Sequence, residues 1–217
     1  MPLSSTDSKT IETLVASVES RTGVQVVVAA IEKADNYIEL PWKAFALGAS
    51  MAAFATVLAD LWRPEWVTSE TALASAVVIL GVASACALLA IFVPRFARLF
   101  LRATRGHLEV KQYARSLFLT RELFRTRSRT AVLILVSGFE RRIEILPDVG
   151  LHDRVSEAEW LRVVDVMAAR LRDARPVLHA VQEGLAAVEH LLASKGFRGG
   201  PRVTNALPDS PIDERGA

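Results

Sequence analysis

Two long apolar runs dominate the hydropathy pattern of the chain. No charged residue occurs at positions 44–59 or 71–94. A helix needs about 20 apolar residues to cross the hydrocarbon core of a bilayer, and the second run supplies them by itself. The first run reaches this length when it is counted from Trp42 to Leu61. Because neither run has the polar face of a soluble core helix, we expect a transmembrane helical hairpin at residues 41–94.

The ends of these runs carry residue types that favour a membrane–water interface, namely tryptophan and long cationic side chains. The predicted interface residues are Trp42, Lys43, Trp62, Trp66, Arg95, Arg98, Arg102 and Arg105. Four of the arginines follow the second run, whereas the connecting loop offers only Arg63. By the positive-inside rule, we expect both termini to be cytoplasmic.

The flanking segments have the periodicity of a soluble α/β domain. A helix capped by Asp7 or Thr6 and ended by Gly23 precedes a β-branched strand at 24–31. Beyond the hairpin we expect a helix at 107–126, a buried strand at 130–137 and an alternating strand at 141–146.

Two more helices are expected after these strands. The first begins at a capping box formed by Ser156 and Glu159, and the second begins at Pro176. Residues 1–40 are too few to form a domain alone. They therefore join residues 95–194 in one α/β domain, in which helices cover a small mixed sheet. Residues 195–217 are rich in Gly, Pro and Asp, and we expect a flexible tail there.

Composition and charge narrow the possible partners. One cysteine excludes a disulfide scaffold, and 51% hydrophobic residues exclude a disordered chain. The overall charge of +2 hides a segment, residues 94–142, with 12 Lys+Arg against 3 Asp+Glu. Nucleic-acid binding would require aromatic platforms among these basic residues. We therefore expect the lipid bilayer and its anionic headgroups, not nucleic acid, as partners.

The order of elements and three stretches resemble the TPM-domain family, in particular its bacterial membrane-embedded branch. The stretches are RTGVQVVVAAIEKADNYIELPWKAFALGAS (21–50), HLEVKQYARSLFLTRELFRTRSRTAVLILVSGFERRIEILPDVGL (107–151) and VSEAEW (155–160). The resemblance implies a three-layer α/β/α sandwich, which the hairpin interrupts here. The hairpin itself predicts a two-pass location in the cell inner (plasma) membrane. The resemblance also implies a divalent-metal site in some members, acid phosphatase activity in plant relatives and accessory roles beside membrane complexes in others.

Four acidic residues are candidates for such a metal site, with Ca²⁺ or Mg²⁺ as the ion. They are Asp35, Asp148, Asp153 and Glu157. Asp35 and Asp148 follow strands, and sites often form outside the carboxyl ends of strands in open α/β sheets. The alternative is structural: Asp148 shapes a turn with Gly150, and Glu157 sits at a helix N-terminus.

No catalytic motif stands out, because HExxH, CxxC, nucleophile-elbow and GxGxxG patterns are absent from the sequence. His107 opens a helix without an evident acid–base partner. The leading hypothesis is a membrane-anchored module that binds or supports other membrane components, including another membrane protein. The alternative is a divalent-metal-dependent phosphatase that acts on phosphoesters or phosphoproteins.

Overall fold

The computed structural model describes residues 4–62, 68–126, 128–172, 177–199 and 207–216. The chain divides into two compact units, which are described separately: an α/β unit of residues 1–35 and 106–217, and a hairpin unit of residues 36–105. The hairpin unit therefore extends beyond the predicted 41–94 at both ends.

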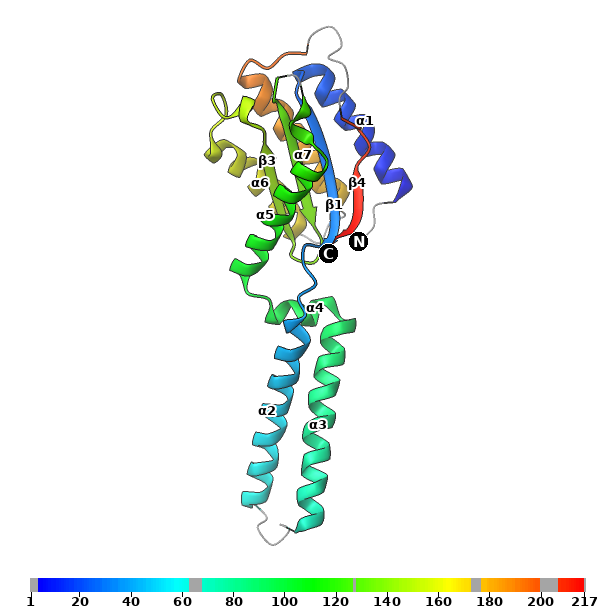
Figure 1. The fold of residues 1–217 in the computed structure, drawn as a ribbon, viewed down its shortest axis with the longest axis vertical. Coiled ribbons are helices and arrows are strands. Elements are labelled where there is room, and N and C mark those ends of the chain that lie inside the picture. The colour runs from blue at the N-terminus through cyan, green and yellow to red at the C-terminus, as the bar shows by residue number, and fades with distance from the viewer. Residues whose placement is uncertain (1–3, 63–67, 127, 173–176, 200–206, 217) are drawn as a thin grey trace. The chain divides into compact units, whose positions relative to one another are not determined.

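The α/β unit is built on a four-stranded sheet with the order β3-β2-β1-β4 (Figure 1). Its strands are β1 (Gln25–Lys33), β2 (Ala131–Ser137), β3 (Arg142–Pro147) and β4 (Ile212–Gly216). β2 and β4 run parallel to β1, and β3 runs antiparallel to β2. The sheet is thus small and mixed, as the sequence predicts. β1 precedes the hairpin in the chain and β2 follows it, so the hairpin is an insertion into this sheet.

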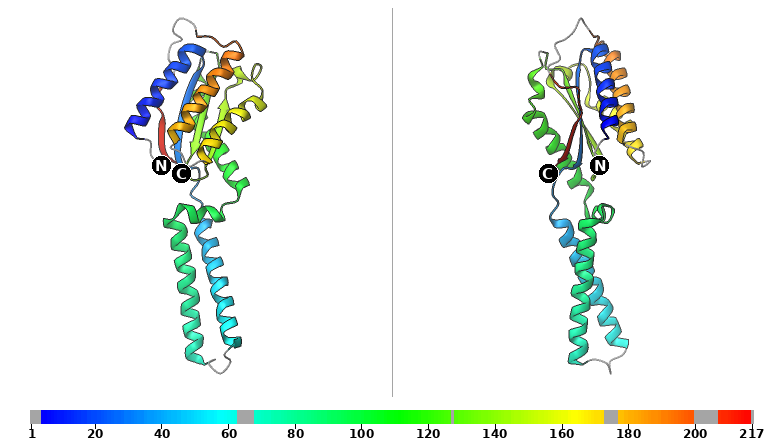
Figure 2. Two further views of the ribbon diagram at one scale, coloured as in Figure 1. Left: turned by 180° about the vertical axis from the view of Figure 1, so that it is seen from behind. Right: turned by 90° about the vertical axis from the view of Figure 1, so that its right-hand side faces the viewer.

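Helices cover both faces of the sheet (Figure 2). α1 (Ser5–Thr22), α6 (Glu157–Arg172) and α7 (Val177–Ser194) lie on one face, and α5 (Ala103–Thr120) lies on the other. Successive residues of a strand point to opposite faces. Accordingly Val26 and Val28 pack with α1, α6 and α7, whereas Val27 packs with α5. This two-sided burial is why β1 and β2 read as continuous apolar runs.

Most helix ends agree with the capping rules, with three shifts from the prediction. One is that α5 begins at Ala103, so His107 lies inside the helix and does not open it. Ser4, not Asp7 or Thr6, caps α1, and Asp7 completes its capping box from the third helical position. Gly23 ends the helix in the left-handed conformation, as expected. α5 stops at Thr120, six residues earlier than predicted, because Glu122 adopts a φ of +50° before a short 3₁₀ turn. Pro176, the expected start of α7, lies outside the described residues.

The C-terminal segment differs from the flexible tail that its composition predicts. Leu207 is buried in the core beneath α5, and β4 pairs in parallel with β1. The Glu214 carboxylate accepts a hydrogen bond from the Tyr113 hydroxyl at 3.0 Å and pairs with Arg121 at 2.5 Å. Burial raises the pKa of Tyr113 to about 12, so the phenol remains a neutral donor. Residues 207–216 take this structure because β1 offers them an edge and α5 offers them partners, neither of which local composition reveals.

The hairpin unit consists of α2 (Glu39–Trp62), α3 (Ser69–Phe92), the short α4 (Pro94–Ala97) and a 3₁₀ turn, η2 (Arg98–Phe100). α2 and α3 pack along small residues. The buried positions of α2 are Leu40, Ala44, Gly48 and Ala52, at four-residue intervals. A Cβ atom on Gly48 would lie 2.8 Å from the Cys86 sulfur of α3. The glycine therefore allows close approach of the two backbones.

The large apolar side chains of the same two helices point outward. Phe54, Leu73, Val77 and Phe92 are each more than 60% exposed, whereas the buried residues of α3 are Ala83 and Ala90. Both helices are long and apolar enough to cross a membrane. Their small residues are inside and their large apolar residues outside, which is the reverse of a soluble helical pair.

Candidate functional site

Asp148, the acidic residue after β3, is held by Arg129. The guanidinium donates from Nε to Oδ2 at 2.9 Å and from Nη2 to Oδ1 at 3.0 Å. The same carboxylate accepts the Val149 N–H at 2.8 Å and so caps a 3₁₀ turn, η4 (Val149–Leu151). Asp148 is 3% exposed. These contacts match the turn-shaping alternative from the sequence, because arginine and backbone already occupy both carboxylate oxygens.

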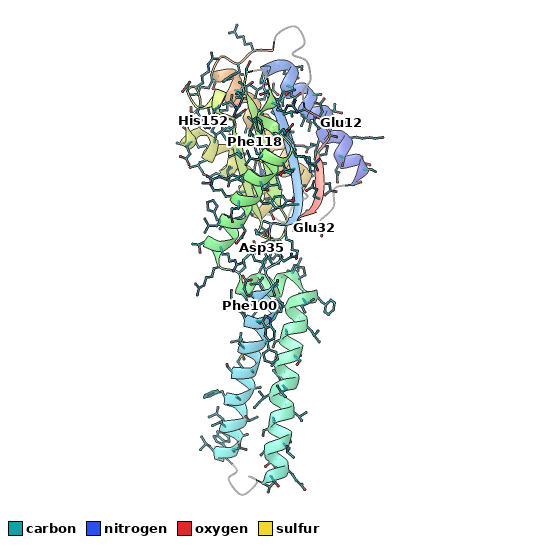
Figure 3. The ribbon with its side chains drawn as sticks, viewed as in Figure 1. Glu12, Glu32, Asp35, Phe100, Phe118 and His152 are labelled. Carbon is teal, nitrogen blue, oxygen red and sulfur yellow. The ribbon has the colours of Figure 1, made fainter. Side chains whose placement is uncertain are left out.

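Asp35 lies at the other end of the sheet from Asp148. In Figure 3, Asp35 is labelled, and the label of His152 marks the end of η4, the turn that Asp148 caps. Asp35 follows β1, which ends beside the last residues of β2. β3 runs antiparallel to β2, and the Asp148 N–H donates to Ala131 at the start of β2. Six residue steps along a strand separate the two ends, about 20 Å. The structure does not bring Asp35 and Asp148 together.

The remaining acidic candidates also stay apart from Asp35. Asp153 is exposed in the turn after η4, and Glu157 is exposed in the first turn of α6. Beside Asp35, the Glu140 carboxylate accepts the Ala34 N–H at 2.9 Å and the Ser137 hydroxyl. Across the described part of the chain, no group of three or more His, Cys, Asp or Glu side chains is placed to hold a metal ion.

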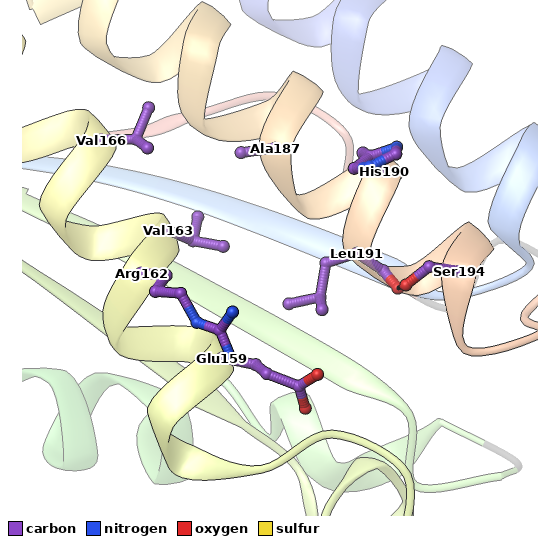
Figure 4. Close-up of a pocket in the computed structure, with 8 residues that line it drawn as sticks. All are labelled: Glu159, Arg162, Val163, Val166, Ala187, His190, Leu191 and Ser194. Carbon is purple, nitrogen blue, oxygen red and sulfur yellow. Dashed lines mark hydrogen bonds between the residues drawn. The ribbon is translucent and has the colours of Figure 1, made fainter.

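A pocket of about 290 Å³ lies between α6 and α7 (Figure 4). Val163, Val166 and Leu191 form its apolar wall, and Glu159 lies at its rim. Glu159 pairs with Lys195 at 2.7 Å and accepts the Ser156 N–H at 2.9 Å, which is one half of the predicted capping box. The contacts with Lys195 and Ser156 lower the pKa of Glu159 to about 2. The carboxylate thus links α6 to the end of α7.

A group of basic side chains faces Glu144 of β3. His107, Lys111 and Arg115 project from α5, and Arg142 precedes Glu144 by two residues on β3. Burial raises the pKa of Glu144, while these four basic side chains act in the opposite direction. His107 therefore has an acidic neighbour that the sequence did not reveal. The four-residue spacing of His107, Lys111 and Arg115 indicates in the sequence that they share one side of a helix. The sequence does not indicate which strand that side faces.

The predicted interface residues of the hairpin unit fall into two groups. Trp42 and Lys43 open α2, close to α4 and η2, which carry Arg95 and Arg98. Trp62 ends α2 and is 87% exposed, whereas Trp42 is 68% exposed. Trp66 lies outside the described residues. The structure brings the arginines of α4 and η2 to the same end of the hairpin as Trp42.

Arg105, which the sequence places at the interface, has a different set of contacts. Its Nη1 pairs with Glu39 at 2.7 Å, and its guanidinium lies over the Tyr37 ring at 5.9 Å. Tyr37 is 3% exposed and adopts a φ of +48°. Arg105 therefore stabilises the start of α2 within the hairpin unit, and its charge is largely balanced by Glu39.

Comparison with known proteins adds a likeness of fold. No family model matches the chain, and no curated protein matches it. The NMR structure of the BA42 protein from the psychrophilic bacterium Bizionia argentinensis is similar, with a TM-score of 0.58 and 13% sequence identity. The match covers 97% of this chain and 94% of that one. At this identity the likeness concerns the fold alone.

Proposed function

We propose that this chain is a membrane-anchored accessory module of the TPM-like type, whose hairpin spans the bilayer and whose α/β unit binds other membrane components. The observation that carries the proposal is the distribution of side chains on α2 and α3. In the most apolar 18-residue stretch of each helix, only 17% is buried in α2 and only 11% in α3. A soluble core helix would be mostly buried, whereas lipid tails cover exposed Leu, Val and Phe without cost.

The spacing of the tryptophans supports a spanning orientation of α2. Trp42 and Trp62 are twenty residues apart on one helix, which corresponds to about 30 Å. This equals the thickness of a typical hydrocarbon core, and tryptophan favours the two interfaces. At the Trp42 end, α4 and η2 combine Arg95 and Arg98 with Leu99, which is 77% exposed. Such a segment suits an interface with anionic headgroups.

Strand pairing constrains the topology. β1 and β2 pair over seven residues although the hairpin separates them in the chain. Both ends of the hairpin must therefore lie on one side of the bilayer, as a two-pass insertion requires. From the arginines of α4 and η2 and the positive-inside rule we infer that this side is the cytoplasm and that the membrane is the inner membrane.

Labelling of single cysteines tests this topology. In a Cys86→Ala background, we compare Ser8→Cys in α1 with Ser69→Cys at the start of α3. We expect an impermeant maleimide to label intact spheroplasts at position 69 and to label position 8 only after permeabilisation. The opposite pattern would reverse the orientation. Release of the unmodified chain from membranes by alkaline carbonate would refute the membrane anchor.

Purification in mild detergent tests the accessory role. We expect a stoichiometric membrane protein to co-elute with the full chain and to be lost when the α/β unit is removed. Elution of the chain without any other membrane protein would contradict the accessory role. It would leave the membrane anchor intact. Metal-dependent phosphatase activity stays a prediction from the family resemblance, since no contact among the described residues favours it.

A further inference from the structure

One flank of α5 carries a regular row of basic side chains. His107, Lys111 and Arg115 are four residues apart, so they project from one side of the helix at about 6 Å intervals. Val110, Ala114 and Phe118 form the adjacent buried stripe that packs on the sheet. The orientation of the helix about its axis is thus determined by its own core contacts.

The row lies toward β3 because the opposite flank of α5 contacts β4. Tyr113, on that opposite flank, donates its hydroxyl hydrogen to Glu214 of β4 at 3.0 Å. β4 and β3 are the two edges of the sheet, and in Figure 1 α5 crosses its near face with β4 to the right. The basic row of α5 therefore follows the β3 edge.

β3 presents matching groups on the same face. Ile143 and Ile145 pack against α1, α6 and α7, so the alternate residues Arg142, Glu144 and Leu146 face α5. Leu146 packs in the core beneath α5. From Arg142 to Leu146 the strand rises about 13 Å, and from His107 to Arg115 the helix rises about 12 Å. We call His107, Lys111, Arg115, Arg142 and Glu144 the α5–β3 basic surface.

Basic side chains outnumber acidic ones on this surface. Lys111, Arg115 and Arg142 stand beside a single carboxylate, that of Glu144. His107 and Arg115 are exposed, whereas Lys111, Arg142 and Glu144 are half-buried. Half-buried cations attract an anion more strongly than fully solvated ones, because the local dielectric is lower. A phosphate group offers one negative charge in a diester and about two in a monoester, together with several acceptor oxygens, which suit arginine and lysine donors.

We propose that the α5–β3 basic surface is a binding site for a phosphate group, with Lys111 and Arg115 as its donors and Arg142 contributing positive charge beside them. The site lies within the α/β unit and does not depend on the proposed membrane function. The phosphate can belong to an anionic lipid headgroup or to a soluble phosphoester. In either case the Glu144 carboxylate repels the phosphate and weakens its binding. We therefore expect the affinity for phosphate to rise when that charge is removed.

The test uses the full chain in neutral maltoside micelles with two probes. Pyrophosphate is titrated calorimetrically, and phosphatidylglycerol is added in mixed micelles while the thermal unfolding midpoint is followed. The double variant Lys111→Gln with Arg115→Gln is compared with Lys9→Gln with Arg162→Gln. The control removes the same charge from exposed positions on α1 and α6, which cover the opposite face of the sheet.

We expect the α5 double variant to weaken binding about 25-fold, at about fivefold per cation, and the control to change it less than twofold. Glu144→Gln is expected to strengthen binding about fivefold. Lys111→Arg, which keeps the charge, is expected to bind like the unmodified chain. Circular dichroism of each variant establishes that the fold is retained.

Each outcome decides the proposal. Pyrophosphate binding that the α5 double variant weakens supports a soluble phosphoester, and a phosphatidylglycerol response that it weakens supports a lipid headgroup. If neither probe binds, or if the control pair weakens binding as much as the α5 pair, the proposal is wrong. The cysteine labelling at positions 8 and 69 is independent of this result. If it gives the expected pattern while phosphate binding fails, the phosphate site is wrong and the membrane anchor stands.

Discussion

At the scale of single residues, Asp148 shows how one residue type can satisfy two interpretations of the sequence. An aspartate after a strand suits both a metal site and a turn. The bidentate contact with Arg129 and the N–H of Val149 are the contacts expected of a turn-shaping residue. Arg129 is 19 residues away in the chain, so no local pattern identified it as the partner.

We predict that Asp148→Asn destabilises the α/β unit by about 1–3 kcal/mol, because a buried acceptor loses charge-assisted hydrogen bonds. Urea unfolding of the full chain in neutral detergent measures this change. Asp153→Asn, at an exposed turn position, serves as the control and should change stability by less than about 0.5 kcal/mol. Equal effects of the two substitutions would contradict a structural role for the Asp148–Arg129 pair.

We predict that the ionisation of Glu19 makes the stability of the α/β unit depend on pH. Burial raises the pKa of Glu19 to about 7, the Val26 N–H lowers it and the neighbouring Asp209 carboxyl raises it further. The folded pKa exceeds the ordinary value of 4.5. The stability that Glu19 contributes is therefore fully present below about pH 4.5 and is lost as the pH rises through about 7.

We expect Glu19→Gln to remove this dependence, because glutamine keeps an acceptor for the Val26 N–H at 2.8 Å and cannot ionise. At pH 8 the variant should be about 1–2 kcal/mol more stable than the unmodified chain, an amount reduced for partial solvent access. At pH 4.5 the difference should vanish. Glu12→Gln, on the exposed side of α1, is the control for charge removal. A gain in stability that is the same at both pH values would refute the assignment to Glu19.

At the scale of elements, strand and helix types follow from periodicity, whereas their neighbours do not. The alternation of Ile143 and Ile145 correctly predicts a strand with two different faces. The strand at Ile212–Gly216 was missed because its sequence, IDERG, has no apolar alternation. It forms because β1 has an unpaired edge there, a condition that only the assembled sheet provides.

For two glycines of the hairpin we predict different effects of the same substitution. A Cβ atom on Gly48 would lie 2.8 Å from the Cys86 sulfur and 3.1 Å from the Ala83 Cα, whereas nothing lies within 4 Å of a Cβ atom on Gly81. Gly48→Val should therefore destabilise α2–α3 packing by about 1–3 kcal/mol, and Gly81→Val should not. Thermal unfolding of the full chain in one detergent compares the pair. A larger loss for Gly81→Val would indicate that α3 packs through another face.

At the scale of the whole molecule, the fold is an α/β unit interrupted in the chain by a helical hairpin. β1 lies before the insertion, and its partner β2 begins about a hundred residues later. The core contacts of Val26 and Val27 are made with elements of the α/β unit on both faces of the sheet. Both faces of β1 are therefore packed by elements of the α/β unit itself.

We predict that residues 1–35 joined to residues 106–217 by about twelve Gly/Ser residues form a soluble folded unit. Such a linker spans roughly 20 Å as a flexible coil. Its solubility after ultracentrifugation and a cooperative unfolding transition are the measurements. The full chain should remain in the membrane fraction of the same cells. An aggregated product without a cooperative transition would indicate that the hairpin contributes to the core of the unit.

The sequence by itself determined the two apolar helices, the small mixed sheet and the assignment of most strands, because burial imposes a period on the chain that can be read locally. The tertiary structure alone decided which residues meet. An antiparallel β3 separates Asp35 from Asp148, β4 completes the sheet, and the facing of α5 on β3 gathers His107 with Glu144. These outcomes depend on strand direction and helix orientation, which arise from packing between segments far apart in the chain.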